Sequence, residues 1–324
     1  MVFPLERPRR LRSSHTLRNM VSETVLSVND LIYPIFVVHG NNVKNEIKPM
    51  PGQYHWSVDR LDEIIAQVVS AKVPAVILFG IPKIKDKNAS ENYSDDGIVQ
   101  QAIKAIKKQA PNLVVITDVC LCAYTEEGHC GIYDHHHDVV LNDETLPLLA
   151  KTAISHAQAG ADIVAPSGMI DGMIQAMREG LDKVGFVDTA IMSYAVKYAS
   201  AFYGPFRAAC DSSPKGDRKT YQMDFRNAKE ALREASLDEI EGADFLMVKP
   251  ALAYMDIIYR VSEVTNLPMV AYHISGEYAL VKAAAEKGWV DEKAIMLETL
   301  YGLKRAGAKL IITYAAIDVA NWIA

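Results

Sequence analysis

Eight short apolar runs recur along the chain, each separated from the next by a segment with helical periodicity, and this repetition constrains the fold most strongly. Continuous apolar runs are typical of strands that are buried on both faces of a parallel sheet. Parallel neighbours also need a crossover connection, usually a helix. The expected strands are residues 31–38, 75–80, 113–120, 161–167, 189–198, 243–250, 268–275 and 308–315.

Eight strands that alternate with helices predict an α/β chain folded as a (β/α)8 barrel. The competing fold is an open doubly wound sheet, which usually carries a glycine-rich turn after its first strand. Here the first strand runs into Val37-Val38-His39-Gly40, which is no such turn. Helices are expected at residues 58–71, 97–110, 144–159, 171–182 and 227–241.

The domain organisation follows from where the repeats begin. Residues 1–25 contain several arginines and few core signals, so we expect an N-terminal arm that lies on another subunit. Residues 26–324 are expected to form one barrel domain, which is a common size for this fold.

Composition excludes several classes of partner. A formal net charge of −6, without an extended basic stripe, argues against a nucleic-acid surface. No apolar run approaches the roughly 18 residues of a membrane span, and no hydrophobic signal region follows the basic N-terminus. We therefore expect a cytoplasmic protein without a membrane partner. Three of the four cysteines fall within eleven residues, which indicates a metal site and not a disulfide framework.

Polar groups stand at the ends of the expected strands. Active sites of barrels lie at the carboxyl ends of the strands, and six of the eight strands here end in a group able to do chemistry. Lysine is among the residues least often buried, so a lysine that closes a core strand must reach water, a partner or a substrate. Two such lysines suggest amine chemistry, although either one alone could be a surface residue. The strand-end residues are Asp118 with Cys120, Ser167, Lys197, Lys249, Ser275 and Tyr314.

The cysteine cluster has the spacing Cys120-x-Cys122-x7-Cys130. Three thiolates suit zinc and leave the fourth tetrahedral position open, as catalytic sites require. His129 could instead close a structural site. We interpret the run His135 to His137 as a solvated loop and Cys210 as a simple loop thiol.

Residues 203–222 form the longest expected connection in the second half of the chain, directly after the Lys197 strand. Long loops in compact domains are commonly lids over active sites. Between Tyr203 and Lys219 this loop has four basic residues against two acids, whereas the whole chain is acidic. A cationic lid fits a substrate that bears carboxylates, and the alternative is a polar surface loop with scattered charge.

Four motifs, MSYAVKYASAFYGPFR, FLMVKPALAYMDI, DVCLCAYTEEGHCG and RAGAKLIITY, resemble the zinc-cysteine type of the porphobilinogen synthase (5-aminolaevulinate dehydratase) family. The similarity extends from about Arg7 to the C-terminus. It implies a lyase that condenses two molecules of 5-aminolaevulinate into porphobilinogen, in tetrapyrrole and haem biosynthesis. It also implies a homo-octamer assembled through N-terminal arms.

The resemblance implies a role for each matching residue. Lys249 matches the lysine that holds one substrate as a Schiff base, and Lys197 matches the second lysine, which engages the other substrate. The zinc ligands match Cys120, Cys122 and Cys130, and Glu234 matches a site where some members bind an allosteric magnesium ion. Asp118 and Ser167 match polar groups near the reacting amines. The substrate-binding set comprises Ser275 and Tyr314 for the first substrate, Arg207, Arg218 and Gln222 for the second, and Tyr203 and Phe206 in the lid.

Three local sequences depart from the family pattern. Gly168 follows Ser167 where an Asp or Asn is usual, the lid is one residue shorter, and residues 224–227 differ near the magnesium region. A Schiff-base lysine must also be more acidic than an ordinary lysine, and we expect the second lysine and the apolar strand end to lower its pKa. Two alternatives stay open: a class I aldolase-type barrel, and a non-catalytic protein with a structural zinc.

Overall fold

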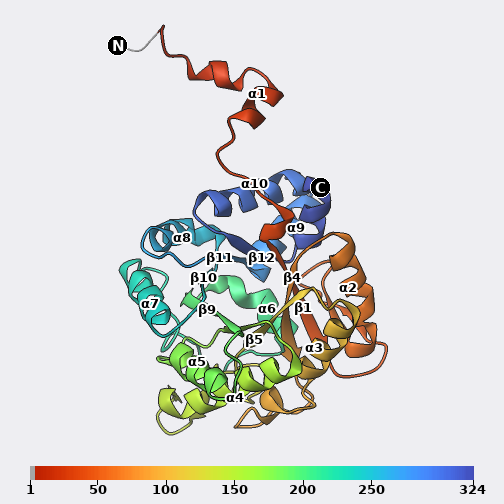
Figure 1. Ribbon diagram of the computed structural model, residues 1–324, viewed down its shortest axis with the longest axis vertical. Coiled ribbons are helices and arrows are strands. Elements are labelled where there is room, and N and C mark those ends of the chain that lie inside the picture. Colours follow the sequence, from red (N-terminus) through yellow and green to blue (C-terminus); the bar gives the residue numbers. More distant parts are fainter. Residues whose placement is uncertain (1–3) are drawn as a thin grey trace.

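The computed structural model describes residues 4–324 and shows a closed barrel of eight parallel strands surrounded by helices (Figure 1). The strands follow one another around the barrel in chain order, and the last pairs with the first, Ile311 lying opposite Leu31. This closure confirms the predicted (β/α)8 barrel and excludes the open sheet. The barrel strands are β1 (Leu31–Val38), β4 (Ala75–Ile81), β5 (Val114–Val119), β8 (Ile163–Pro166), β9 (Ala190–Lys197), β10 (Phe245–Lys249), β11 (Met269–His273) and β12 (Leu310–Thr313).

Helices cover the outside of the barrel because each carries one apolar face. In α2, Leu61, Ile64, Ile65 and Val68 are buried, at the spacing of a single helical stripe. The five helices predicted with ranges are present, with ends shifted by up to three residues. The outer helices are α2 (Leu61–Ser70), α3 (Ile98–Gln109), α4 (Asn142–Ala159), α5 (Met173–Lys183), α7 (Lys229–Ile240), α8 (Met255–Ser262), α9 (Ser275–Glu286), α10 (Glu292–Arg305) and α11 (Ala316–Ile323).

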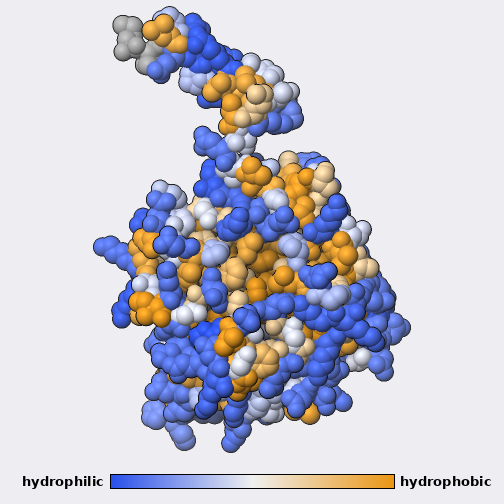
Figure 2. Space-filling model, viewed as in Figure 1, coloured by the Kyte–Doolittle hydropathy of each residue, from blue (hydrophilic) through white to orange (hydrophobic). Residues whose placement is uncertain are grey.

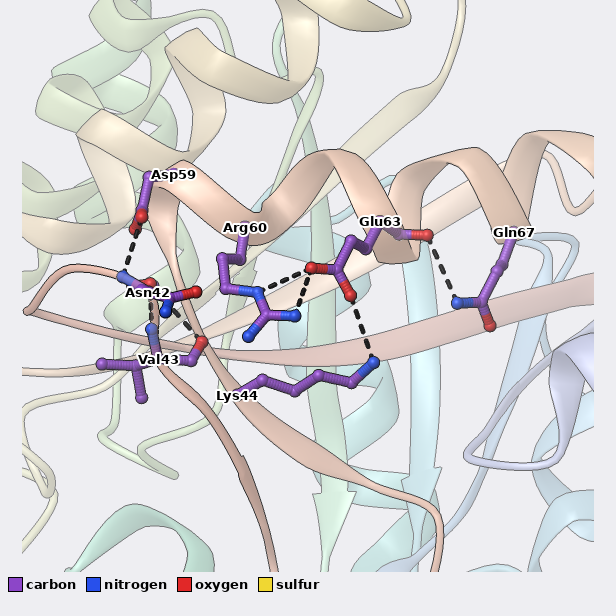
Figure 3. Close-up of polar contacts among 8 residues, drawn as sticks. Asn42, Val43, Lys44, Asp59, Arg60, Glu63 and Gln67 are labelled. Carbon is purple, nitrogen blue, oxygen red and sulfur yellow. Dashed lines mark hydrogen bonds and ion pairs between the residues drawn. The ribbon is translucent and has the colours of Figure 1, made fainter.

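Two short strands, β2 (Lys44–Glu46) and β3 (Tyr54–Ser57), extend the sheet beside β1 and were not predicted. Polar contacts tie this hairpin to the first turn of α2 (Figure 3). Glu63 accepts hydrogen bonds from Lys44 Nζ at 3.1 Å and from Arg60 Nε at 2.6 Å. Asp59 accepts the backbone N–H of Asn42 at 2.8 Å. Strands of three and four residues are too short to show an alternating pattern in the sequence.

Two further segments differ from the expected loops. The predicted lid begins with a 3-10 helix, η5 (Ala201–Tyr203), and a short helix, α6 (Gly204–Cys210), which has a proline in its first turn. The prediction of an uninterrupted loop from residue 203 was therefore wrong, because seven residues give too little periodicity to recognise. After β5, the cysteine-rich segment contains a hairpin of β6 (Ile132–Asp134) and β7 (Val139–Leu141). The remaining short turns are η3 (Val58–Arg60), η4 (Ser90–Tyr93) and η6 (Leu252–Tyr254).

The N-terminal segment extends away from the barrel (Figure 1) and contains η1 (Pro8–Arg12) and α1 (His15–Met20). Several of its apolar side chains are exposed: Leu5 is 79%, Met20 77% and Val25 71% exposed. Figure 2 shows these apolar surfaces along the arm. The arm joins the barrel through η2 (Val28–Asp30), where Asp30 pairs with Lys304 of α10 at 3.1 Å. None of the helices in residues 4–324 is long and apolar enough to span a membrane.

An aromatic layer fills the barrel. Phe36 of β1 lies 5.6 Å from Phe79 of β4 and 6.0 Å from Tyr314, measured between ring centroids. Phe206 of α6 packs on Phe79 at 5.1 Å, so the short helix in the lid segment closes over this layer. The polar strand ends gather around these rings.

Candidate active site

Lys197 and Lys249 are the last residues of β9 and β10, and they are paired in the register of the two strands. Both are buried, with 5% and 4% of their surface exposed. The Lys197 ammonium donates a hydrogen bond to the backbone carbonyl of Ser167. Neither lysine is therefore a surface residue beyond a strand end, which was the simpler interpretation of each.

Four aromatic rings surround the Lys249 amine. Its Nζ lies 4.5 Å from the ring centroid of Tyr272, 4.9 Å from Phe206, 5.1 Å from Tyr194 and 5.4 Å from Tyr203. Burial, and then the positive charge of Lys197, lower the pKa of Lys249 from 10.5 to about 7, while Asp118 acts in the opposite direction. A large fraction of this amine is therefore neutral and nucleophilic near neutral pH. Both expected causes of the shift are present.

Asp118, near the end of β5, faces both lysines. Desolvation raises the pKa of this carboxyl group above its ordinary value, although Lys197, Lys249 and a hydrogen bond with Ser167 oppose the change. Ser167 follows β8 and is 4% exposed. A carboxyl group of raised pKa beside two amines can give or take a proton during a reaction at the amines.

The side chains of Cys120, Cys122 and Cys130 are buried, and their sulfur atoms all lie within 4.8 Å of one another. Hydrogen bonds from the other two thiols lower the pKa of Cys130 well below its usual value. A preformed cluster of this kind, with one thiolate favoured, matches the donor set that binds zinc.

His129 does not complete the cysteine cluster. Its Nδ1 lies 3.1 Å from the Tyr221 hydroxyl, and its Nε2 lies 2.8 Å from the backbone carbonyl of Lys215. Within residues 4–324, the three cysteines are the only group of His, Cys, Asp and Glu side chains in metal-binding proximity. His135, His136 and His137 are exposed, as expected for a solvated loop.

Cys210 is not the simple loop thiol that we expected. It is the last residue of α6 and is only 2% exposed. With Asp118, Cys120 and Cys122 it lines one small cavity beside the aromatic layer. The spacing of 80 residues from Cys130 concealed this approach, because it depends on α6 folding back beside the strand ends.

The predicted contacts for the second substrate come together in the lid segment. Each of these three residues has buried side-chain atoms without a hydrogen-bond partner in residues 4–324: Nε of Arg207, Nε of Arg218, and Nε2 and Oε1 of Gln222. Arg218 is held in place because it donates to the carbonyls of Gly128 at 2.7 Å and Ser212 at 2.9 Å. Burial and the charge of Arg218 lower the pKa of Arg207. Buried polar atoms without partners are costly, and an anionic ligand would satisfy the N–H donors among them.

The contacts predicted for the first substrate come from the start of α9 and the end of β12. Ser275 begins α9 and is 1% exposed, and its Oγ has no partner in the described chain. Tyr314 follows β12, and its hydroxyl lies 3.0 Å from that of Tyr272. Tyr203 and Phe206 belong to the rings that cover Lys249.

Glu234 lies apart from the lysines, on α7. It lines a cavity of about 510 Å³ together with Asp171, Asp224, Glu230 and Gln222. Burial raises the pKa of Glu234, and the charges of Asp171 and Glu230 add to this effect. The structure therefore places Glu234 in an acidic pocket that borders the lid.

Sequence reasoning missed three further residues near the lysines. Tyr194 lies three positions before Lys197, and strict alternation would place two such residues on opposite faces of a strand, so the irregular register of β9 against β10 concealed it. Tyr272 lies within the buried strand β11, where every residue is apolar or aromatic except His273, so nothing in the sequence singled it out. Glu277 is 1% exposed and follows Ser275 by two residues. An acid in the first turn of a helix is usually a capping residue, so nothing in the sequence distinguished it.

A parallel barrel that buries two paired lysine amines at the carboxyl ends of its strands defines an enzyme that acts on carbonyl compounds through a lysine. The chain belongs to the delta-aminolevulinic acid dehydratase family, whose model matches residues 5–322.

Known relatives cover almost the whole chain. It is 58% identical to the delta-aminolevulinic acid dehydratase of Synechocystis sp., over 99% of both chains. It is 56% identical to that of Bacillus subtilis, over 98% of both. A crystal structure of the Toxoplasma gondii enzyme in complex with its product porphobilinogen superposes with a TM-score of 0.96, at 45% identity, over 98% of this chain and 91% of the other.

Proposed function

We propose that this chain condenses two molecules of 5-aminolaevulinate into porphobilinogen with loss of two waters, the reaction that its relatives' names and the bound product of one relative indicate. The observation that carries the proposal is the register pair of buried lysines, in which the pKa of Lys249 is lowered to about 7. Two amines side by side suit a reaction that joins two copies of one carbonyl substrate.

Lys249 forms the covalent bond to the first substrate. Its neutral amine attacks the ketone carbon, and the resulting carbinolamine loses water to give an iminium ion. The positive charge of the iminium acidifies the neighbouring carbon, which can then form the new carbon–carbon bond. Asp118 supplies the proton that the departing hydroxyl needs, a role that its raised pKa supports. Lys197 engages the second substrate.

The carboxylates of the two substrates have separate partners. Ser275 and Tyr314 bind that of the first substrate. Arg207, Arg218 and Gln222 bind that of the second, and their unpartnered buried atoms support this assignment. Tyr203 and Phe206 exclude water from the Lys249 amine.

Cys120, Cys122 and Cys130 would hold a zinc ion, which the proximity of their sulfur atoms supports. When bound, zinc supplies a Lewis acid that polarises the second substrate. The contacts of His129 with Tyr221 and Lys215 count against a closed structural site. The three thiols and the second lysine likewise count against a class I aldolase, which needs neither.

The decisive experiment is borohydride trapping in the presence of 5-aminolaevulinate, followed by peptide mass mapping. Substrate-derived mass on Lys249, with porphobilinogen formation lost when a chelator removes zinc, is the expected result. Lys249→Arg should abolish the adduct, and the exposed Lys309→Met is the matched control. No adduct on Lys249 or Lys197 in zinc-replete protein would overturn the proposal.

Three further assignments complete the proposal. Glu234 binds an allosteric magnesium ion, which the acidic cavity on α7 supports, and Glu234→Gln should then abolish any activation by magnesium.

The exposed apolar arm packs on a second copy of the chain in a homo-oligomer, for which the family resemblance suggests an octamer. Four free cysteines support a reducing, cytoplasmic setting.

A further inference from the structure

The buried carboxylate of Glu277 connects two segments of the site that are distant in sequence. Its Oε1 accepts the backbone N–H groups of Ala251 at 3.1 Å and Leu252 at 2.6 Å. Its Oε2 accepts the N–H of Ile274 at 2.8 Å. Ala251 lies two residues after Lys249, and Ile274 immediately precedes Ser275. One side chain therefore joins the end of β10 to the start of α9.

The lid segment contacts the start of α9 as well. A Cβ atom on Gly276 would lie 2.2 Å from the backbone oxygen of Phe202, so the first turn of α9 packs directly on η5. Next to Phe202, the Tyr203 hydroxyl donates to the carbonyls of Tyr198 at 2.8 Å and Lys249 at 3.4 Å. The strand end, the helix start and the lid thus share one rigid junction.

Glu277 takes part in no ion pair within residues 4–324, so backbone donors alone hold its charge. Burial raises the pKa of Glu277 to about 7, and its backbone hydrogen bonds act in the opposite direction. The ionised carboxylate accepts from both segments with both oxygens, whereas protonation turns one of these oxygens into an O–H donor. A neutral amide at this position would present an N–H donor to one of the two segments.

We infer that Glu277 is a positioning residue that fixes the distance between Lys249 and Ser275, and through it the fit of the first substrate. This inference rests on the proposed function, in which Lys249 bonds the ketone carbon of that substrate and Ser275 binds its carboxylate. If the two segments separate, the substrate cannot satisfy both contacts at once, and the attacking geometry is lost.

The test compares Glu277→Gln with the control Glu286→Gln, an exposed glutamate on the same helix. At about pH 8.5, where Glu277 is ionised, the Glu277 variant should show a KM for 5-aminolaevulinate raised about tenfold and borohydride trapping on Lys249 slowed about tenfold. The control should match the unaltered enzyme. Ser275→Ala should raise KM by a smaller factor in the Glu277→Gln variant than in the unaltered enzyme. The contact between Ser275 and the substrate carboxylate is already impaired in that variant.

Equal KM and equal trapping rates in folded Glu277→Gln would overturn the inference, even if the variant melted at a lower temperature. If that variant does not fold, Glu277→Asp, which keeps the charge but is too short to span both segments, is measured in the same way. Failure of the unaltered enzyme to trap substrate would instead count against the proposed function itself. The two failures are therefore distinguishable.

Discussion

Lys197 lies directly opposite Lys249 in the parallel pairing of β9 with β10. Neighbouring strands are about 4.8 Å apart, so both side chains leave the same face of the sheet at nearly the same height. The positive charge of Lys197 then makes it harder for Lys249 to be charged. This geometry, together with burial, accounts for the low pKa of Lys249.

Replacing Lys197 should make Lys249 less acidic. In Lys197→Met one positive neighbour is lost, so the ammonium form of Lys249 is favoured and its pKa rises from about 7. The pH at which borohydride trapping on Lys249 is half-maximal should move upwards. This midpoint is measured by mass spectrometry across a pH series. A midpoint that stayed in place or moved to lower pH would show that the register pair is electrostatically unimportant.

Replacing Lys249 should stabilise the fold while removing activity. Its pKa is about 7 in the folded chain against 10.5 for an ordinary lysine, so between these values the unfolded state binds more protons. Lys249 therefore lowers the free energy of unfolding most below pH 7, and this destabilisation decreases as the pH rises towards 10.5. Lys249→Met should raise the melting temperature by about 4 °C at pH 7 and by much less at high pH. Calorimetry at two pH values checks this, and a gain that does not depend on pH would contradict the assignment.

Arg207→Met should weaken substrate binding with little effect on folding. The Arg207 Nε has no partner within the described chain, so its replacement breaks no internal hydrogen bond at that atom. A charge-assisted hydrogen bond to a carboxylate contributes about 1.5–3 kcal/mol, which corresponds to a rise in KM of about 10- to 150-fold. Steady-state kinetics measure the change in KM, and a thermal melt of the same variant checks that its folding is unaffected. An unchanged KM would remove Arg207 from the carboxylate site.

The metal ligands can be counted with cobalt in place of zinc. Three thiolate ligands should give strong sulfur-to-metal charge-transfer absorption, and Cys130→Ser should lower its intensity by roughly one third or abolish binding. Cys210→Ser is the matched control, because Cys210 lies outside the group of three sulfur atoms in mutual proximity. A loss of intensity in the Cys210 variant as well would add a fourth thiolate to the site.

Deleting residues 1–25 should reduce the size of the assembly. The arm exposes apolar side chains such as Leu5, Met20 and Val25, which we expect another copy of the chain to cover. Light scattering should give a smaller particle for the truncated protein, whereas far-ultraviolet circular dichroism should still show the barrel. The same particle size with and without the arm would argue against arm-mediated association.

The barrel could be predicted because its strands are buried on both faces, which leaves eight apolar runs in the sequence. The proximity of Lys197 and Lys249 could also be predicted, because both lysines end strands and all parallel strands of a barrel end at the same face. The short elements were not predictable in this way. The strands β2, β3, β6 and β7 have three or four residues each, and α6 has seven, so none completes a recognisable period.

The parts of the site that depend on tertiary contacts were also beyond prediction. Cys210 lines a small cavity with Cys120 and Cys122 because α6 folds back over the barrel, although its sulfur lies outside the group of three. Glu277 resembles an ordinary acid in the first turn of a helix, and its bonds to Ala251 and Leu252 cross 26 and 25 residues of sequence, respectively. Such roles arise from packing between elements, and no local pattern records them.

Two of the four rings over the Lys249 amine, those of Tyr203 and Phe206, belong to the segment that begins the lid. The lowered pKa of the Lys249 amine therefore depends partly on this segment, because two of the rings that bury the amine belong to it. We expect that a displacement of η5 and α6 would rehydrate the amine and raise its pKa, which would leave less of it neutral. The reactivity of the Lys249 amine would then depend on how this segment is seated.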